Sequence, residues 1–207
     1  MRVCRYVMNK CNQFTTMKIV YIHGLSSSGS SGTADRLRKY LPNDCIYSPD
    51  LPIDPFEALN MLQEMVDREN IDLVIGTSMG GMFAQKLRGY NKIMVNPSFH
   101  VSQSMRQKIG QNEFFSKRAD GATHYDITTD LCNRYESIER NQFEDITDHE
   151  RAISMGLFGT EDDVVNCLAE YKQHYTRFGT FVGGHRLSEE TVKTILIGEI
   201  EKFRELL

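Results

Sequence analysis

Short apolar runs alternate with helical patterns along most of the chain. The pattern predicts strands at residues 19–22, 45–47, 73–75, 93–95, 153–158 and 180–182. It predicts helices near residues 33–41, 55–70, 79–89, 102–110, 165–178 and 188–207. Several of the strands are apolar at successive positions, which is typical of strands buried on both faces of a parallel sheet. We therefore expect an α/β fold with a mostly parallel central sheet flanked by helices.

One long segment, residues 97–151, breaks this alternation. It is polar and rich in charged residues, Asn, Gln and Thr. We expect a small polar excursion above the sheet, made of one or two short helices and loops. Two interpretations stay open for it: a surface insertion without a role, or a cap that contributes to function.

The strand pattern begins cleanly at Met17, and no long linker or repeat divides the rest of the chain. Residues 17–207 are therefore expected to form a single domain. Residues 1–16 are expected to be an N-terminal extension, either disordered or read from a start codon upstream of the true one. They lack the apolar core of a secretory signal.

Composition excludes several classes of protein. The chain has 24 basic and 28 acidic residues, a net charge of −4, so no broad basic surface is available for nucleic acid. No apolar stretch approaches the ~18 residues of a membrane span. Five scattered cysteines without a CxxC pair favour a reducing, cytoplasmic setting over disulfides or zinc. No metal is expected, since H-E-x-x-H and similar ligand spacings are missing.

The strongest chemical signal is the sequence GTSMG at residues 76–80. It follows an apolar strand and precedes a helical pattern, which is the context of a G-x-S-x-G nucleophile turn. The glycines would let the neighbouring strand and helix approach the turn closely. Ser78 is therefore the predicted nucleophile, and the alternative is a serine that only caps the helix.

The oxyanion donors are expected from two main-chain N–H groups, those of Leu25 and Met79. Leu25 follows His23-Gly24 at the end of the first strong strand, and Met79 follows the nucleophile. We expect His23 to hold this loop, with a direct catalytic role as the alternative. The serine-rich stretch at residues 26–32 lacks a P-loop ending and is expected to cap the next helix.

An activated serine needs a base, and the base needs an acid. In hydrolases with this kind of serine turn, the acid follows the serine along the chain and the histidine follows the acid. The candidates in that order are Asp162 as the acid and His185 as the base. Asp162 is preferred over its neighbours Glu161 and Asp163 because the acid usually lies three residues after the strand's glycine. The alternatives are that these acids only begin a helix, or that Asp126 or Asp130 serves instead.

Together these residues resemble an α/β-hydrolase, and more closely the small bacterial esterases of the YqiA type. The matching segments are YIHGLSSS at 21–28, GTSMGG at 76–81, VNP at 95–97, IGQNE at 109–113 and GGH at 183–185. Departures are the N-terminal extension, a small shift in the acidic loop, and Arg186 where the family more often has alanine.

The resemblance implies a cofactor-independent serine esterase of short-chain acyl esters that uses a Ser-His-Asp triad. The expected partner is a small-molecule acyl ester, with no nucleic acid or membrane, and the oligomeric state stays open. Phe99, Met105, Phe114 and Phe115 are expected either to line an acyl pocket or to pack in the core. Alternatives are a thioesterase or other acyl or carbon–carbon hydrolase, or a non-catalytic binding module on the same scaffold.

Overall fold

The structure is a computed structural model that describes residues 16–206. The predicted extension at residues 1–16 lies outside the described residues except for Thr16, and Leu207 at the end of the last predicted helix lies outside as well. Within residues 16–206, no helix is both long and apolar enough to cross a bilayer.

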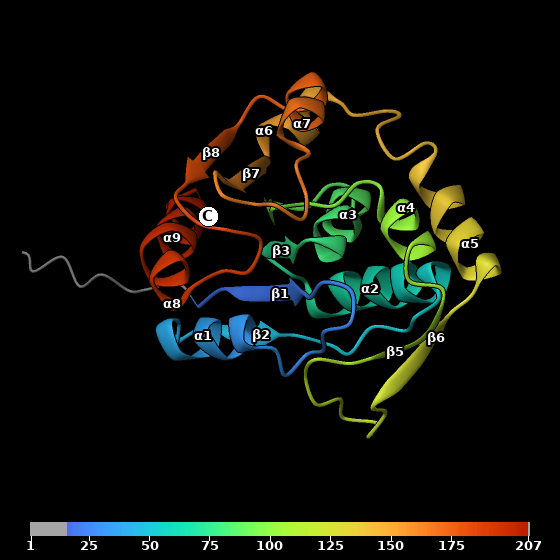
Figure 1. The fold of residues 1–207 in the computed structure, drawn as a ribbon. Helices are drawn as coiled ribbons and strands as arrows, with labels where there is room; N and C mark the ends of the chain where they lie inside the picture. The colour runs from blue at the N-terminus through green and yellow to red at the C-terminus, as the bar shows by residue number, and fades with distance from the viewer. Residues whose placement is uncertain (1–15, 207) are drawn as a thin grey trace, which may run out of the picture.

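The central sheet has six strands in the order β2-β1-β3-β4-β7-β8, and every neighbouring pair is parallel (Figure 1). The predicted parallel sheet is therefore confirmed. The strands are β1 (Lys18–Ile22), β2 (Cys45–Tyr47), β3 (Leu73–Thr77), β4 (Lys92–Val95), β7 (Ser154–Gly159) and β8 (Phe178–Phe181).

Helices cover both faces of the sheet, since side chains of the strands alternate between two separate cores. Val20 and Ile22 of β1 pack in one core, and Ile19 and Tyr21 pack in the other. The first core involves α2 (Pro55–Glu69), α3 (Met79–Lys86), α4 (Val101–Arg106), α5 (Thr129–Glu139) and α7 (Leu168–His174). The second involves α1 (Gly32–Tyr40), η1 (Val192–Leu196) and α9 (Ile197–Arg204), and the short α8 (Glu189–Thr191) leads into η1.

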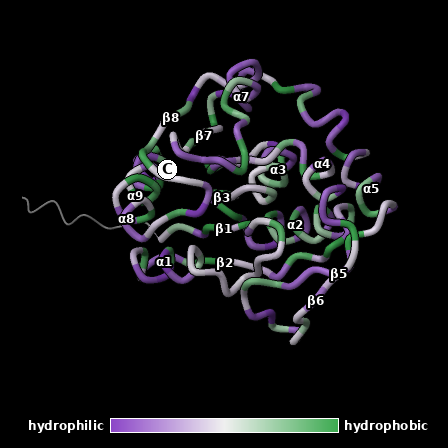
Figure 2. Tube along the Cα trace, in the orientation of Figure 1, coloured by the Kyte–Doolittle hydropathy of each residue, from purple (hydrophilic) through white to green (hydrophobic). Residues whose placement is uncertain are grey.

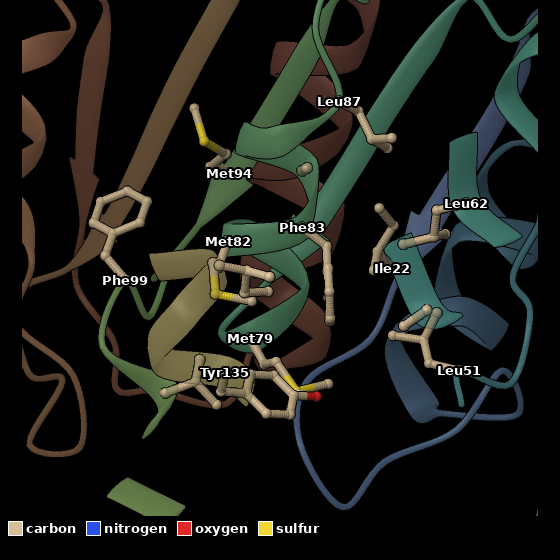
Figure 3. Close-up of a cluster of buried hydrophobic side chains, with 14 of the residues drawn as sticks. Ile22, Leu51, Leu62, Met79, Met82, Phe83, Leu87, Met94, Phe99 and Tyr135 are labelled. Atoms are coloured by element: carbon tan, nitrogen blue, oxygen red, sulfur yellow. The ribbon is translucent and has the colours of Figure 1, made fainter. Parts of the chain in front are cut away.

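The first core surrounds α3, the helix that follows β3. Figure 3 shows Met82 and Phe83 of α3 between Ile22 on one side and Phe99 on the other. All four side chains are fully buried. Figure 2 shows the same distribution along the chain, with hydrophobic residues concentrated on β1 and β3 at the centre. Helix α3 is thus fixed between the sheet and the excursion.

The excursion at 97–151 contains more structure than the sequence predicted. Besides α4 and α5 it holds α6 (Asp148–Ala152) and a separate antiparallel pair, β5 (Gly110–Glu113) with β6 (His124–Ile127). The pair escaped prediction because β5 has no apolar residue. The predicted helix at 102–110 ends at Arg106, and the chain enters β5 at Gly110 with φ +120°.

The predicted helix at 165–178 is shorter at both ends than expected. Residues 165–167 belong to the loop after β7, because the Asp162 carboxylate accepts hydrogen bonds from the N–H groups of Val164 and Val165. At the other end, Gly156 of β7 donates to the Arg177 carbonyl, so β8 begins at Phe178.

A buried ion pair joins the excursion to the sheet. Lys92 at the start of β4 is fully buried, and its Nζ lies 2.9 Å from Oε2 of Glu150 in α6. Lys92 also donates to the Leu87 carbonyl, and Glu150 accepts from the Gly89 N–H. Burial lowers the pKa of Lys92 to about 8, although Glu150 acts in the opposite direction. Each charge depends on the other for its stability in the interior.

We expect Glu150→Ala to lower the free energy of unfolding by about 3–5 kcal/mol, because it leaves the Lys92 ammonium buried without its carboxylate. The double variant Lys92→Met, Glu150→Leu removes both charges and should recover most of that loss. Urea unfolding followed by circular dichroism measures both. A single variant as stable as the wild type would contradict this account of the pair.

Candidate active site

Ser78 occupies a tight turn between β3 and α3. Its backbone has φ 56° and ψ −122°, a conformation that non-glycine residues rarely adopt. A Cβ on Gly76 would lie 2.1 Å from the Gly80 carbonyl oxygen, and one on Gly80 would lie 2.0 Å from the Ile22 carbonyl oxygen. The two glycines of the motif are therefore required by main-chain contacts. The turn has the geometry that the G-x-S-x-G pattern predicts.

His185 reaches the serine from the loop that follows β8. Its Nε2 lies 3.0 Å from the Ser78 Oγ, within hydrogen-bond distance. The loop approaches β7 closely, since a Cβ on Gly159 would lie 2.4 Å from the Gly183 carbonyl oxygen. The side chain of His185 keeps 18% of its surface exposed, so a small molecule can approach the ring.

Asp162 binds the far side of the imidazole from the loop after β7. Its Oδ2 lies 2.8 Å from the His185 Nδ1, and its side chain is only 3% exposed. Its Oδ1 accepts the N–H groups of Val164 and Val165, each at 2.9 Å. The carboxylate is thus oriented by its own loop before it meets the histidine.

The other candidate acids do not make this contact. Glu161 and Asp163 flank Asp162 but are exposed, and so are Asp126 in β6 and Asp130 in α5. Helix α7 begins only at Leu168, so Asp162 is not an acid of its first turn. Of the acids weighed from the sequence, the structure brings only Asp162 to the histidine.

Both expected oxyanion donors are close to the serine along the chain or one residue from a group that packs on it. Gly24 packs against it, because a Cβ there would lie 3.2 Å from the Ser78 Cβ, and Leu25 is the next residue. Met79 is the first residue of α3, where the helix end carries partial positive charge. Within residues 16–206, neither of these two N–H groups donates to a protein acceptor.

His23 is buried and holds the loop beside the serine. Its Nδ1 lies 2.8 Å from the Gly24 carbonyl oxygen, and its Nε2 accepts the Leu51 N–H at 3.3 Å. Burial lowers its pKa. One ring nitrogen donates and the other accepts, which is the arrangement of a neutral imidazole. These contacts match the loop-holding role expected from the sequence.

The excursion packs on the loop that carries Leu25. Ser26, which has φ 61°, accepts the Phe115 N–H through its carbonyl oxygen at 2.7 Å. Its hydroxyl lies 2.5 Å from the Tyr125 hydroxyl, and Ser28 donates to the Lys117 carbonyl at 2.9 Å. Of the excursion's aromatic candidates, Phe115 is 68% exposed beside this loop. The contacts favour the interpretation of the excursion as part of the site.

Unlike Phe115, the other apolar candidates of the excursion pack in the core or against it. Phe99 and Met105 are fully buried in the core, and Phe114 packs against that core from a half-buried position. The expectation of core packing is correct for these three. Within residues 16–206, no three His, Cys, Asp or Glu side chains are grouped in a way that could hold a metal ion.

Asn96, to which no role was assigned from the sequence, lies between the acid and the base. It follows β4, is 3% exposed and has φ 43°. Its Oδ1 accepts the Gly159 N–H at 2.7 Å, and its Nδ2 donates to the carbonyl oxygens of Gly184 and His185 at 3.2 and 3.3 Å. One amide therefore fixes the loops of Asp162 and His185 relative to each other. The feature of the sequence that could have pointed to this role is an Asn directly after a buried strand.

We expect Asn96→Ala to lower kcat about 10-fold or more with a smaller change in KM, because it loosens both loops without removing a reacting group. Asn96→Asp keeps the acceptor for Gly159 but cannot donate to the two carbonyls, so it should not restore the rate. Steady-state hydrolysis of an activated ester checks both variants. Full activity in the alanine variant would show that the amide has no positioning role.

Comparison with known proteins identifies similar chains. The model of a family described as an uncharacterised protein family, UPF0227, matches residues 18–183. A search of curated proteins found no match. The family match agrees with the resemblance expected from the sequence.

Solved structures with this fold are α/β-hydrolases. Est1E from Butyrivibrio proteoclasticus is 13% identical, with a TM-score of 0.64, over 96% of this chain and 92% of that one. Mouse alpha/beta hydrolase domain-containing protein 10 is 12% identical, with a TM-score of 0.62, over 94% and 92%. A thermophilic esterase from Thermogutta terrifontis is 13% identical, with a TM-score of 0.58, over 92% and 91%. At these identities the likeness shows the fold, which is the α/β-hydrolase fold.

Proposed function

Because the chain belongs to the uncharacterised protein family UPF0227 and has an α/β-hydrolase fold, we propose that it is a serine esterase. One observation carries the proposal: the connected contacts from Ser78 Oγ through the His185 ring to the Asp162 carboxylate, at 3.0 and 2.8 Å. A nucleophile hydrogen-bonded to a base, which is in turn oriented by an acid, is the arrangement that activates a serine hydroxyl.

In the proposed reaction, His185 Nε2 accepts the Ser78 proton while Oγ attacks the ester carbonyl. The carbonyl oxygen becomes an oxyanion held by the N–H groups of Leu25 and Met79, each such donor being worth on the order of 3 kcal/mol of barrier. His185 then gives the proton to the leaving alcohol, and an acyl-Ser78 remains. Water, deprotonated by His185, attacks this ester and regenerates the serine.

Asp162 acts on this cycle through the histidine. Its hydrogen bond to Nδ1 holds the tautomer in which Nε2 is free to accept, and its negative charge stabilises the imidazolium that forms. The oxygen not used by the histidine is occupied by the Val164 and Val165 N–H groups. The acid is thus held in place at every step.

The proposed substrates are short-chain acyl esters, supported by the resemblance to small esterases. Among proteins of similar fold, Est1E has been described with ferulic acid bound, and another is named an esterase. The proposed setting is the cytoplasm. The free thiols Cys45, Cys132 and Cys167 support it, because such cysteines are usual in a reducing compartment.

Ser78→Ala should lower kcat for p-nitrophenyl acetate and butyrate by about 10³-fold or more, because it removes the atom that attacks the carbonyl. Ser137→Ala, at an exposed serine of α5, is the matched control and should keep wild-type rates. Circular dichroism verifies that both variants fold. Equal rates in the wild type and Ser78→Ala would rule out the proposed mechanism.

Asp162→Asn should lower kcat by about 10³-fold or more, because an amide favours the wrong histidine tautomer. Asp163→Asn makes the same change at the neighbouring exposed residue and should alter kcat less than about threefold. The two variants are compared on p-nitrophenyl butyrate at one pH. A larger loss of kcat in Asp163→Asn than in Asp162→Asn would show that Asp163, and not Asp162, is the acid.

A further inference from the structure

An unpaired arginine directly follows the histidine of the site. Arg186 is exposed, and its Cζ lies 5.1 Å from the centroid of the Phe115 ring. Among the residues from 16 to 206, it has no carboxylate in ion-pair range and no carbonyl acceptor. Arg118, whose guanidinium also lies over a phenylalanine ring, that of Phe114, differs because it binds Asp120. The guanidinium of Arg186 is therefore positioned by an aromatic ring, and its N–H donors stay free.

The contact between Arg186 and Phe115 spans the site. Arg186 extends from the loop that carries His185, whereas Phe115 donates its N–H to Ser26, the residue after Leu25. Figure 1 shows the segment between β5 and β6 beside the loop that follows β1. Ser78 lies between the two loops, since it contacts His185 on one side and Gly24 on the other. The pair therefore links the two loops that contact Ser78.

The chemistry of the pair favours an anionic group. A guanidinium stacked on a ring still presents its N–H donors in its own plane, where a carboxylate or phosphate accepts two of them at once. Arg186 places a positive charge directly after His185, in a protein whose net charge is −4. Electrostatic recognition of this kind discriminates between charged and neutral substrates.

The position of Arg186 also indicates which part of the substrate it meets. In the proposed reaction the His185 Nε2 gives its proton to the leaving oxygen, so the alcohol part of the ester lies on the histidine side of Ser78. Arg186 is the next residue along the same loop. The acyl part begins at the carbonyl held by Leu25 and Met79.

We propose that Arg186, supported by Phe115, determines specificity by binding a carboxylate or phosphate on the alcohol part of the ester. The inference rests on the proposed esterase function and narrows its substrates to esters of anionic alcohols. Phe115 limits the positions that the guanidinium adopts and adds an apolar surface beside it.

The test compares 4-acetoxybenzoate, whose alcohol part carries a carboxylate, with its neutral methyl ester. The quantity measured is the ratio of kcat/KM for the anionic ester to that for the neutral one, so that intrinsic differences in leaving group cancel between variants. Arg186→Gln should lower this ratio about tenfold, mainly through KM, as expected for loss of a charge-assisted hydrogen bond. Its rate on the neutral ester should stay within about twofold of wild type.

Three further variants make the result specific. Arg140→Gln removes the same charge from an exposed arginine of the excursion that also has no ion pair among the described residues, and should leave the ratio unchanged. Arg186→Lys keeps the charge without the two-pronged geometry and should recover only part of the ratio. Phe115→Leu should lower the ratio less than Arg186→Gln does.

The outcomes separate the inference from the proposed function. Hydrolysis that depends on Ser78, with the same ratio in wild type and Arg186→Gln, overturns the inference and leaves the esterase intact. If neither acetate is hydrolysed in a way that depends on Ser78, the inference and the proposed esterase function are both overturned. A second pair, p-nitrophenyl hydrogen adipate and p-nitrophenyl hexanoate, places the charge on the acyl part. A ratio that falls only for this pair contradicts the placement on the alcohol side.

Discussion

The close approach of main chains at the turn between β3 and α3 is the constraint on which the site depends. Gly80 packs on the Ile22 carbonyl at the end of β1, and Gly76 packs on the Gly80 carbonyl. A helix can begin this near to two parallel strands only if no Cβ lies between them. The same contact brings the end of β1 against the serine. The nucleophile and the loop of one oxyanion donor are therefore positioned by one packing arrangement.

The remaining parts of the site are tied to this turn through β4, which lies between β3 and β7. The Ser78 N–H donates to the Val95 carbonyl at the end of β4, and its own carbonyl accepts the Ser98 N–H. Between these two contacts stands Asn96, which binds the loops of the acid and the base. The end of β4 is thus a common support for groups that come from three separate loops.

The sequence predicted the sheet well because burial on both faces makes its strands apolar at successive positions. It also pointed to Ser78 and His185, since each lies in a short motif next to a strand, and to Asp162 among three adjacent acids. The features it missed depend on long-range contacts. Strand β5 reads GQNE and offers no apolar period, and the role of Asn96 depends on main-chain groups 63 to 89 positions along the chain. The length of α7 was misjudged because the Asp162 carboxylate binds main-chain groups that a helix would otherwise use.

The insertion of the excursion between two neighbouring strands has a consequence for folding. β4 ends at Val95 and its partner β7 begins at Ser154, so pairing them requires closure of the whole excursion. Contacts of such long sequence separation form slowly, whereas β3 and β4 pair locally across α3, with Val74 opposite Lys92. The serine turn can therefore assemble before the strands that carry the acid and the base have docked. During refolding, activity should then return only when β7 and β8 dock on the sheet. Most of the spectroscopic signal of helices and strands should return well before that step.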